Sequence, residues 1–125
     1  FRIAPELLAA VIRPAAERAR GALARQRALL AGRSLFLFPD SQLEIPVARF
    51  LGRELGMRIV EICTPFLQRT HLAEELALLG ADIPVVEGGD VDLQLDRCRA
   101  ARPDITLCGL GLANPLEAEG LTTKW

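Results

Sequence analysis

Apolar and small residues recur at three- and four-residue intervals over residues 5–31, and this spacing predicts one long helix. Pro5 suits a first helical position, and Gly32 suits a helix stop. Pro14 lacks an N–H, so it is expected to kink or divide the helix. The apolar stripe consists of Leu8, Val11, Ile12, Ala15, Ala19, Ala22 and Leu23. Arginines repeat every seven residues on another face, at Arg13, Arg20 and Arg27.

Four short apolar runs follow along the chain, at residues 34–38, 58–63, 83–86 and 105–108. The first run shows no alternation of apolar and polar residues, which is typical of a strand covered on both faces. Pro84 cannot donate to a sheet ladder, so the third strand is expected near an edge of the sheet. Each run therefore predicts a short, buried strand.

Helical segments separate these runs. Ser41 and Glu44 have capping-box spacing, so a helix is expected to start there. A second helix is expected from Thr64-Pro65 to residue 79, a third after Gly88-Gly89-Asp90, and a short one at 115–119. The residues expected to face inward are Leu43, Val47, Phe50, Leu51 and Leu55 on the first helix, Leu72, Leu76 and Leu79 on the second, and Val91, Leu95 and Cys98 on the third.

The alternation of strands and helices predicts right-handed crossovers and a parallel sheet. We expect an α/β fold, a Rossmann-like three-layer α/β/α sandwich with a short parallel sheet, preceded by the long helix. Residues 1–33 would form an Arg-rich helix that connects to the rest of a larger subunit, and 34–125 the Rossmann-like domain. Ligands of such sheets bind beyond the carboxyl ends of the strands, at the switch point of the strand order.

Composition supports a single buried core. Half of the 125 residues are apolar and a quarter are charged, with a mean hydropathy of +0.24. The net charge of −1 argues against nucleic-acid binding. No apolar run approaches the roughly 20 residues of a transmembrane helix. The chain lacks an initiating Met and ends on Trp125, so both ends are expected to be cut from a longer polypeptide.

Charge is divided unevenly along the chain. Residues 2–33 hold seven Arg and two Glu, whereas residues 34–125 hold eight basic and fourteen acidic residues. This division predicts a solvated, Arg-rich helix lying on an acidic body, with a dedicated anion site as the alternative.

Candidate reactive residues are few. Cys63, Cys98 and Cys108 have no metal-site spacing, so we expect buried, inert thiols, no metal ligand and a reducing compartment, the cytoplasm. His71 is expected to be exposed or ion-paired beside acidic residues. Asp40 follows a strand and is the best placed carboxylate, although it is more typical of a turn. No residue is assigned a catalytic role.

Two glycines after the fourth run form part of a dinucleotide fingerprint. Gly109 and Gly111 lack the third glycine, because Asn114 stands in its place. A tight turn is therefore expected instead of a phosphate cradle, and it would let a large planar ligand approach the backbone. From the residues alone, the chain is a Rossmann-like module with an unknown ligand, and a free-standing flavodoxin-like binding domain remains an alternative.

Several stretches together resemble one family. They are residues 36–44, 48–57, 71–76, 122–125 and above all Cys108-Gly109-Leu110-Gly111-Leu112-Ala113-Asn114-Pro115-Leu116-Glu117-Ala118-Glu119-Gly120. This pattern resembles the N subunits of the light-independent protochlorophyllide reductases, which are similar to the nitrogenase molybdenum–iron protein. Related nitrogenase-like subunits, of chlorophyllide reductase or of a cofactor-assembly scaffold, remain alternatives.

The resemblance implies a catalytic component that reduces the D-ring double bond of protochlorophyllide to give chlorophyllide. It implies an N2B2 heterotetramer with a B subunit, a 4Fe-4S cluster between N and B, and electrons from an ATP-dependent iron–sulfur L protein. The cysteine ligands that it implies lie in a region of the family absent from these 125 residues, so no cysteine here is given a ligand role. This chain alone would be inactive.

The resemblance also suggests which residues lie near the pigment. A porphyrin-like substrate needs apolar walls and few polar anchors. Trp125 could stack on the macrocycle or serve ordinary packing, and Lys124 could meet a pigment carboxylate. The residues expected nearest the substrate are Leu110, Gly111, Leu112, Ala113, Asn114, Pro115, Lys124 and Trp125.

Overall fold

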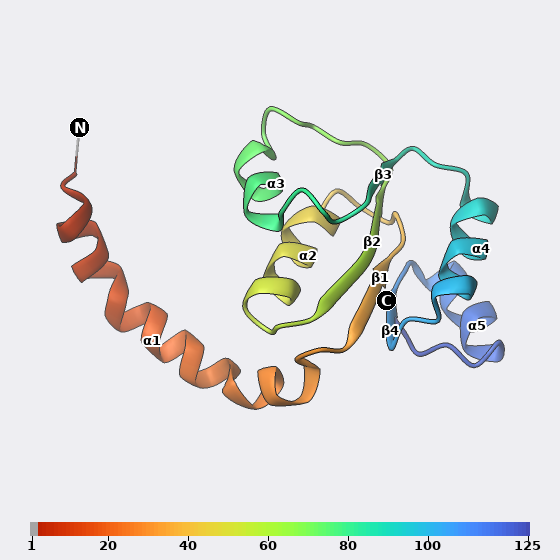
Figure 1. Ribbon diagram of the computed structural model, residues 1–125, viewed down its shortest axis with the longest axis horizontal. Coiled ribbons are helices and arrows are strands. Elements are labelled where there is room, and N and C mark those ends of the chain that lie inside the picture. The colour runs from red at the N-terminus through yellow and green to blue at the C-terminus, as the bar shows by residue number, and fades with distance from the viewer. Residues whose placement is uncertain (1–2) are drawn as a thin grey trace.

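The computed structural model describes residues 3–125, and within them a parallel five-stranded sheet carries helices on both faces (Figure 1). Its elements in chain order are α1 (Pro5–Leu30), β1 (Ser34–Leu37), α2 (Glu44–Arg53), β2 (Arg58–Thr64), α3 (Ala73–Leu79), β3 (Val85–Glu87), α4 (Val91–Ala101), β4 (Ile105–Leu107), α5 (Leu110–Ala118) and β5 (Thr123–Lys124). The predicted α/β sandwich and its long leading helix are thereby confirmed.

The strand order is β3-β2-β1-β4-β5, and every neighbouring pair is parallel. The chain starts at β1 in the centre, builds β2 and β3 on one side, and then returns to build β4 and β5 on the other. The direction of building reverses between β1 and β4, so this pair marks the switch point. β3 lies at an edge, as Pro84 predicted.

Side chains of alternate β1 residues divide the core into two layers. Leu35 and Leu37 pack under α2 and α3, whereas Phe36 and the following Phe38 pack under α4 and α5. The two phenyl rings have centroids 5.1 Å apart. All four β1 residues are buried, which explains the continuous apolar run in the sequence.

The predicted helix from Thr64 to residue 79 is wrong over its first half. Thr64 ends β2, and its hydroxyl donates to the carbonyl of Phe66 and to the carboxylate of Glu44. The N–H of Leu67 donates to a Glu87 carboxylate oxygen, which holds the segment in an irregular path. Only Ala73–Leu79 are helical, because the Phe66 carbonyl and the Leu67 N–H bind side chains in place of helical partners.

Three further helices differ from the sequence prediction in a boundary or in the face that they bury. α2 begins at Glu44 and not at Ser41, and Leu43 is 63% exposed instead of buried. Val91 is exposed at the start of α4, where it was expected to face inward. The expected turn after Gly109 is instead the first part of α5, which begins at Leu110.

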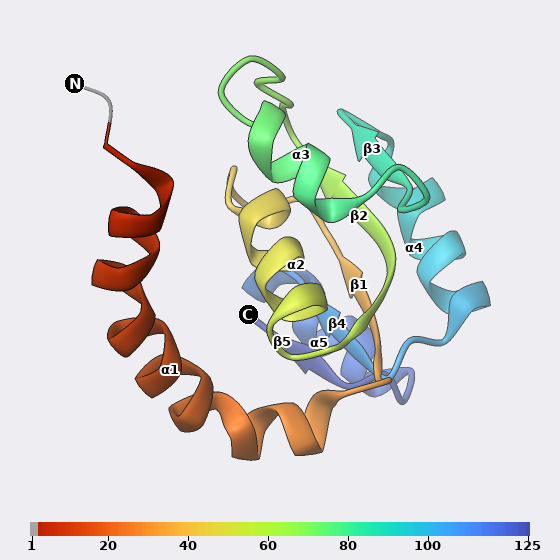
Figure 2. The same ribbon diagram turned by 60° about the vertical axis from the view of Figure 1, so that its left-hand side comes forward.

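α1 stands away from the sheet, so the expectation that it lies on an acidic body is wrong (Figures 1 and 2). It has no buried residue, and Pro14 lies inside it without dividing it. Its C-terminal end meets the body, where Leu30 packs against the α2/α3 layer and Arg27 donates to the carbonyl of Glu54 at 3.0 Å. Among the described residues, no helix combines the length and hydropathy needed to cross a bilayer.

Candidate functional site

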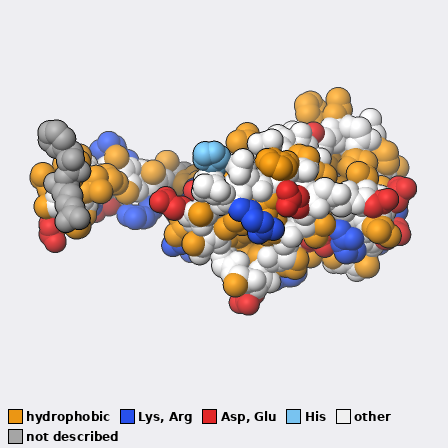
Figure 3. Space-filling view, turned by 90° about the horizontal axis from the view of Figure 1, so that it is seen from above, with side chains coloured by type: hydrophobic (Ala, Val, Ile, Leu, Met, Phe, Trp, Pro, Cys, Tyr) orange, Lys and Arg blue, Asp and Glu red, His pale blue; other side chains and the backbone are white. Residues whose placement is uncertain are grey.

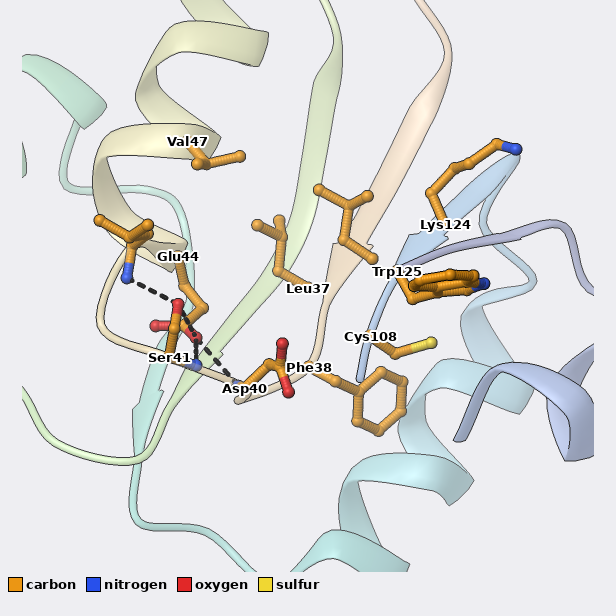
Figure 4. A pocket seen from close by; sticks show the side chains of 11 residues that line it. Leu37, Phe38, Asp40, Ser41, Glu44, Val47, Cys108, Lys124 and Trp125 are labelled. Carbon is orange, nitrogen blue, oxygen red and sulfur yellow. Dashed lines mark hydrogen bonds between the residues drawn. The ribbon is translucent and has the colours of Figure 1, made fainter. Parts of the chain in front are cut away.

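A small pocket opens at the switch point, between the carboxyl ends of β1 and β4 (Figure 4). Its volume is about 170 Å³. Figure 4 shows Ser41, Glu44 and Val47 on one side, with Lys124 and Trp125 on the other. The lining residues are Leu37, Phe38, Asp40, Ser41, Leu43, Glu44, Val47, Leu107, Cys108, Lys124 and Trp125. A crevice forms here because α2 and α5 leave the sheet toward opposite faces.

Glu44 organises the loop that forms one wall of this pocket. Its side chain is buried, with the residue only 5% exposed. One carboxylate oxygen accepts from the backbone N–H groups of Asp40 at 2.9 Å and Ser41 at 2.6 Å. The other oxygen accepts from the hydroxyl of Thr64 at 3.1 Å. The carboxylate therefore ties the β1–α2 loop to the end of β2. The capping-box spacing predicted only its contact with Ser41.

Asp40 and Gly109 approach each other across the switch point. A Cβ on Gly109 would lie 2.6 Å from Oδ1 of Asp40, so a side chain there would displace the carboxylate. Gly109 is the N-cap residue of α5, and its φ of −65° needs no glycine. Close approach, and not an unusual backbone conformation, therefore accounts for Gly109. At Gly111, by contrast, a Cβ would meet open space.

The structure divides the predicted substrate-proximal residues into two groups. Lys124 and Trp125 line the pocket, and Trp125 is 79% exposed. The residues of Leu110–Pro115 belong to α5, and none of these described residues lines this pocket. Within that stretch Leu110 is exposed, whereas Ala113 is buried in the α4/α5 layer.

Sequence reasoning missed most of the apolar wall. Leu37 and Leu107 come from neighbouring strands, and Val47 comes from the first turn of α2. Their apolar character was evident, but their meeting depends on β4 pairing with β1 and not with β3. No local signal in the sequence gives that pairing.

The three cysteines do not form a metal site. All three are buried in the α4/α5 layer. Burial raises the pKa of the Cys63 thiol to about 12, and its hydrogen bond to Glu61 adds to the rise. Burial also raises the pKa values of Cys98 and Cys108, so the thiols stay protonated near neutral pH.

The described residues do not fit an iron–sulfur cluster. Among them, no group of three or more His, Cys, Asp or Glu side chains could hold a metal ion. His71, the only histidine of the sequence, is exposed in the segment before α3. The geometry thus offers a small, mostly apolar binding crevice.

Comparison with known proteins shows the family to which the chain belongs. The family described as nitrogenase component 1 type oxidoreductase matches residues 4–122. A Rhodopseudomonas palustris (strain BisB18) protein named light-independent protochlorophyllide reductase subunit N is 67% identical over 125 residues, which are all of this chain and 29% of that protein. Proteins with the same name from Rhodospirillum rubrum and Rubrivivax gelatinosus are 70% identical over 115 residues and 62% identical over 125 residues. The Rhodospirillum rubrum match covers 92% of this chain and 26% of that protein. The Rubrivivax gelatinosus match covers 100% of this chain and 29% of that protein. The chain therefore spans less than a third of the length of these relatives.

Proposed function

Because the chain belongs to the nitrogenase component 1 type oxidoreductase family, we propose that it is part of the catalytic component of a light-independent protochlorophyllide reductase. This enzyme would reduce the D-ring double bond of protochlorophyllide to give chlorophyllide. The observation that carries the proposal is the 62–70% identity, over nearly the whole chain, to relatives named as subunit N of that enzyme. The names of these relatives favour it over the related nitrogenase-like alternatives.

The proposal includes partners and a cofactor outside this chain. A B subunit would complete an N2B2 heterotetramer in the cytoplasm, and an ATP-dependent iron–sulfur L protein would supply electrons. The 4Fe-4S cluster would take its ligands from other regions, because the buried thiols here do not fit one. Residues 1–33 would connect the domain formed by 34–125 to the rest of the subunit.

The switch-point pocket would receive one edge of the pigment. Its wall is largely apolar, and Lys124 at its rim could pair with a pigment carboxylate. Pockets that enclose drug-sized ligands measure roughly 300–1,000 Å³, whereas this one measures about 170 Å³. The remaining macrocycle would therefore be covered elsewhere, with the start of α5 at Leu110–Pro115 as the nearest candidate within this chain.

Trp125→Ala in the full-length subunit, assembled with its B subunit, tests this proposal. If the indole is a buried pigment contact, the variant should bind protochlorophyllide more weakly by about 1–3 kcal/mol. Leu78→Ala is a matched control, because Leu78 is also an exposed apolar residue but lies on α3, outside the pocket. Pigment affinity and subunit assembly are measured on the same preparation. Reduced assembly with intact affinity would indicate a packing role, and normal values of both would remove Trp125 from the site.

A further inference from the structure

α1 presents a regular packing face over its whole length. Residues that are small or apolar, except for Gln26, follow one another at alternating intervals of three and four, the spacing by which one helix packs along another. We call this face the α1 seam. Its residues are Ala9, Ile12, Ala16, Ala19, Leu23, Gln26 and Leu30. Three of the seven are alanine, which allows a neighbouring helix to approach closely there.

The body covers only the C-terminal part of this seam. Leu23 and Leu30 are half-buried, and Leu30 packs against the α2/α3 layer. Toward the N-terminus the same face continues as an open groove of about 510 Å³, with Leu8, Ile12 and Ala16 in its wall. Figures 1 and 2 show this half of α1 standing clear of the sheet, and Figure 3 shows its hydrophobic side chains on the arm. The groove therefore continues an interface that the molecule already uses.

The exposed surface of the chain is large for its mass. A folded monomer of 13.6 kDa exposes about 6,600 Å² by the usual scaling of surface with mass. This chain exposes 8,277 Å². The excess, on the order of 1,700 Å², is larger than the roughly 800 Å² that each partner buries in a standard protein interface. The exposed surface of α1 is therefore large enough for one further stable interface with another element.

Arginines along the seam indicate the charge of the occupant. Arg13, Arg20 and Arg27 flank the seam at seven-residue spacing. Arg27, the one that reaches the body, donates to the carbonyl of Glu54. Among the ion pairs of the described residues, none includes Arg13 or Arg20. Glu17 also lines the groove, between Arg13 and Arg20, so the charged residues of its wall sum to a net positive charge. An occupant with carboxylates at matching intervals would complete the row of arginines.

The comparisons indicate where the occupant comes from. The family match begins at residue 4, so α1 belongs to the family fold and is not an unrelated tail. The matched relatives are more than three times as long as this chain, which covers at most 29% of those described above. We propose that the α1 seam is the docking face for an acidic α-helix of the same full-length polypeptide, from outside residues 1–125.

Site-specific photo-crosslinking in the full-length subunit identifies the occupant. A benzophenone amino acid replaces Ile12 in the seam, and in a matched control it replaces Ala10. Ala10 does not line the groove, and its position in the helical repeat places it on the opposite face of α1. The expected result at position 12 is a product of single-chain mass, whose crosslinked peptide lies outside residues 1–125 and is rich in Asp and Glu. A product that joins two copies, a crosslink to the B subunit, or no crosslink beyond that of the control overturns the proposal.

Substitutions give a second, independent readout. Arg13→Glu combined with Arg20→Glu should lower the Tm of the full-length subunit, because the row would then repel an acidic helix. Arg18→Glu combined with Arg25→Glu is the matched control, since these arginines have the same spacing on another face of α1. Equal Tm changes in the two pairs would overturn the charge argument. Neither experiment depends on reductase activity, so its outcome is separate from the fate of the proposed function.

Discussion

Two polar side chains of the α4/α5 layer are buried with opposite consequences. Glu61 is paired on both carboxylate oxygens with Arg97, at 2.8–3.0 Å, and also accepts from the Cys63 thiol. Gln94 on α4 is 0% exposed, and within the described structure neither its Oε1 nor its Nε2 has a hydrogen-bond partner. A buried polar group without a partner retains its full cost of desolvation. Gln94 is therefore the weak point of this layer.

Gln94→Met should stabilise the protein. The substitution keeps the length of the side chain and removes two unpaired polar atoms, so the free energy of unfolding should rise by about 1–2 kcal/mol. Denaturant unfolding measures the change, and Gln68→Met at an exposed position is the control, expected near zero. A decrease in stability for Gln94→Met would contradict the prediction and indicate that the buried amide has a partner, such as a water molecule.

At the scale of elements, local patterns predicted strands better than helix ends. The run 34–38 is apolar because both faces of β1 are covered, and periodicity alone reveals that. The start of α3 was missed because the Thr64 hydroxyl binds the Phe66 carbonyl, which a helix would use, and the Glu87 side chain holds the N–H of Leu67. A turn was wrongly expected after Gly109 because glycine was taken as a signal for a turn. The segment is the start of α5, and Gly109 instead allows close packing against Asp40.

The two glycines at the start of α5 should therefore respond differently to alanine. Gly111→Ala places a methyl group in open space within a helix, so stability should rise by about 0.5–1 kcal/mol. Gly109→Ala forces the Asp40 carboxylate to move, so it should lower stability and change the shape of the switch-point pocket. Thermal unfolding of both variants checks this. Equal effects would show that Asp40 does not pack against Gly109.

Asp104 joins the starts of β1 and β4, and it should make the folding stability of the chain depend on pH in the acidic range. Its carboxylate accepts from the hydroxyl and N–H of Ser34 and from Arg33, and these hydrogen bonds lower its pKa from 3.8 to about 2. A lowered folded-state pKa gives stability that is present above pH 3.8 and is lost as the pH falls toward 2. Unfolding of Asp104→Asn should lack this part of the pH dependence. A parallel pH profile for variant and parent would contradict it.

At the scale of the whole molecule, sequence reasoning named part of the candidate pocket and misplaced the long helix. Lys124 and Trp125, which the family resemblance suggested near the substrate, line the switch-point pocket. The wall from Leu37 and Leu107 could not be predicted, since it depends on the strand order. The helix was expected on the body from its charge, but surface charges contribute little to packing and cannot position an element.

The exposed α1 seam should make the isolated 125-residue chain self-associate. With no other part of the polypeptide to cover the seam, Ile12 in the seam and Leu8 beside it remain in water, and a second copy can bury them. Light scattering at about tens of micromolar, a range in which exposed apolar surface drives association, should give a mass above the 13.6 kDa of one chain. Ile12→Asp should shift the mass toward the monomer, and Ala10→Asp should not. Circular dichroism confirms that both variants keep their helices. A soluble monomer of the parent chain would contradict the prediction, and a shift of equal size in the two variants would locate the contact outside the seam.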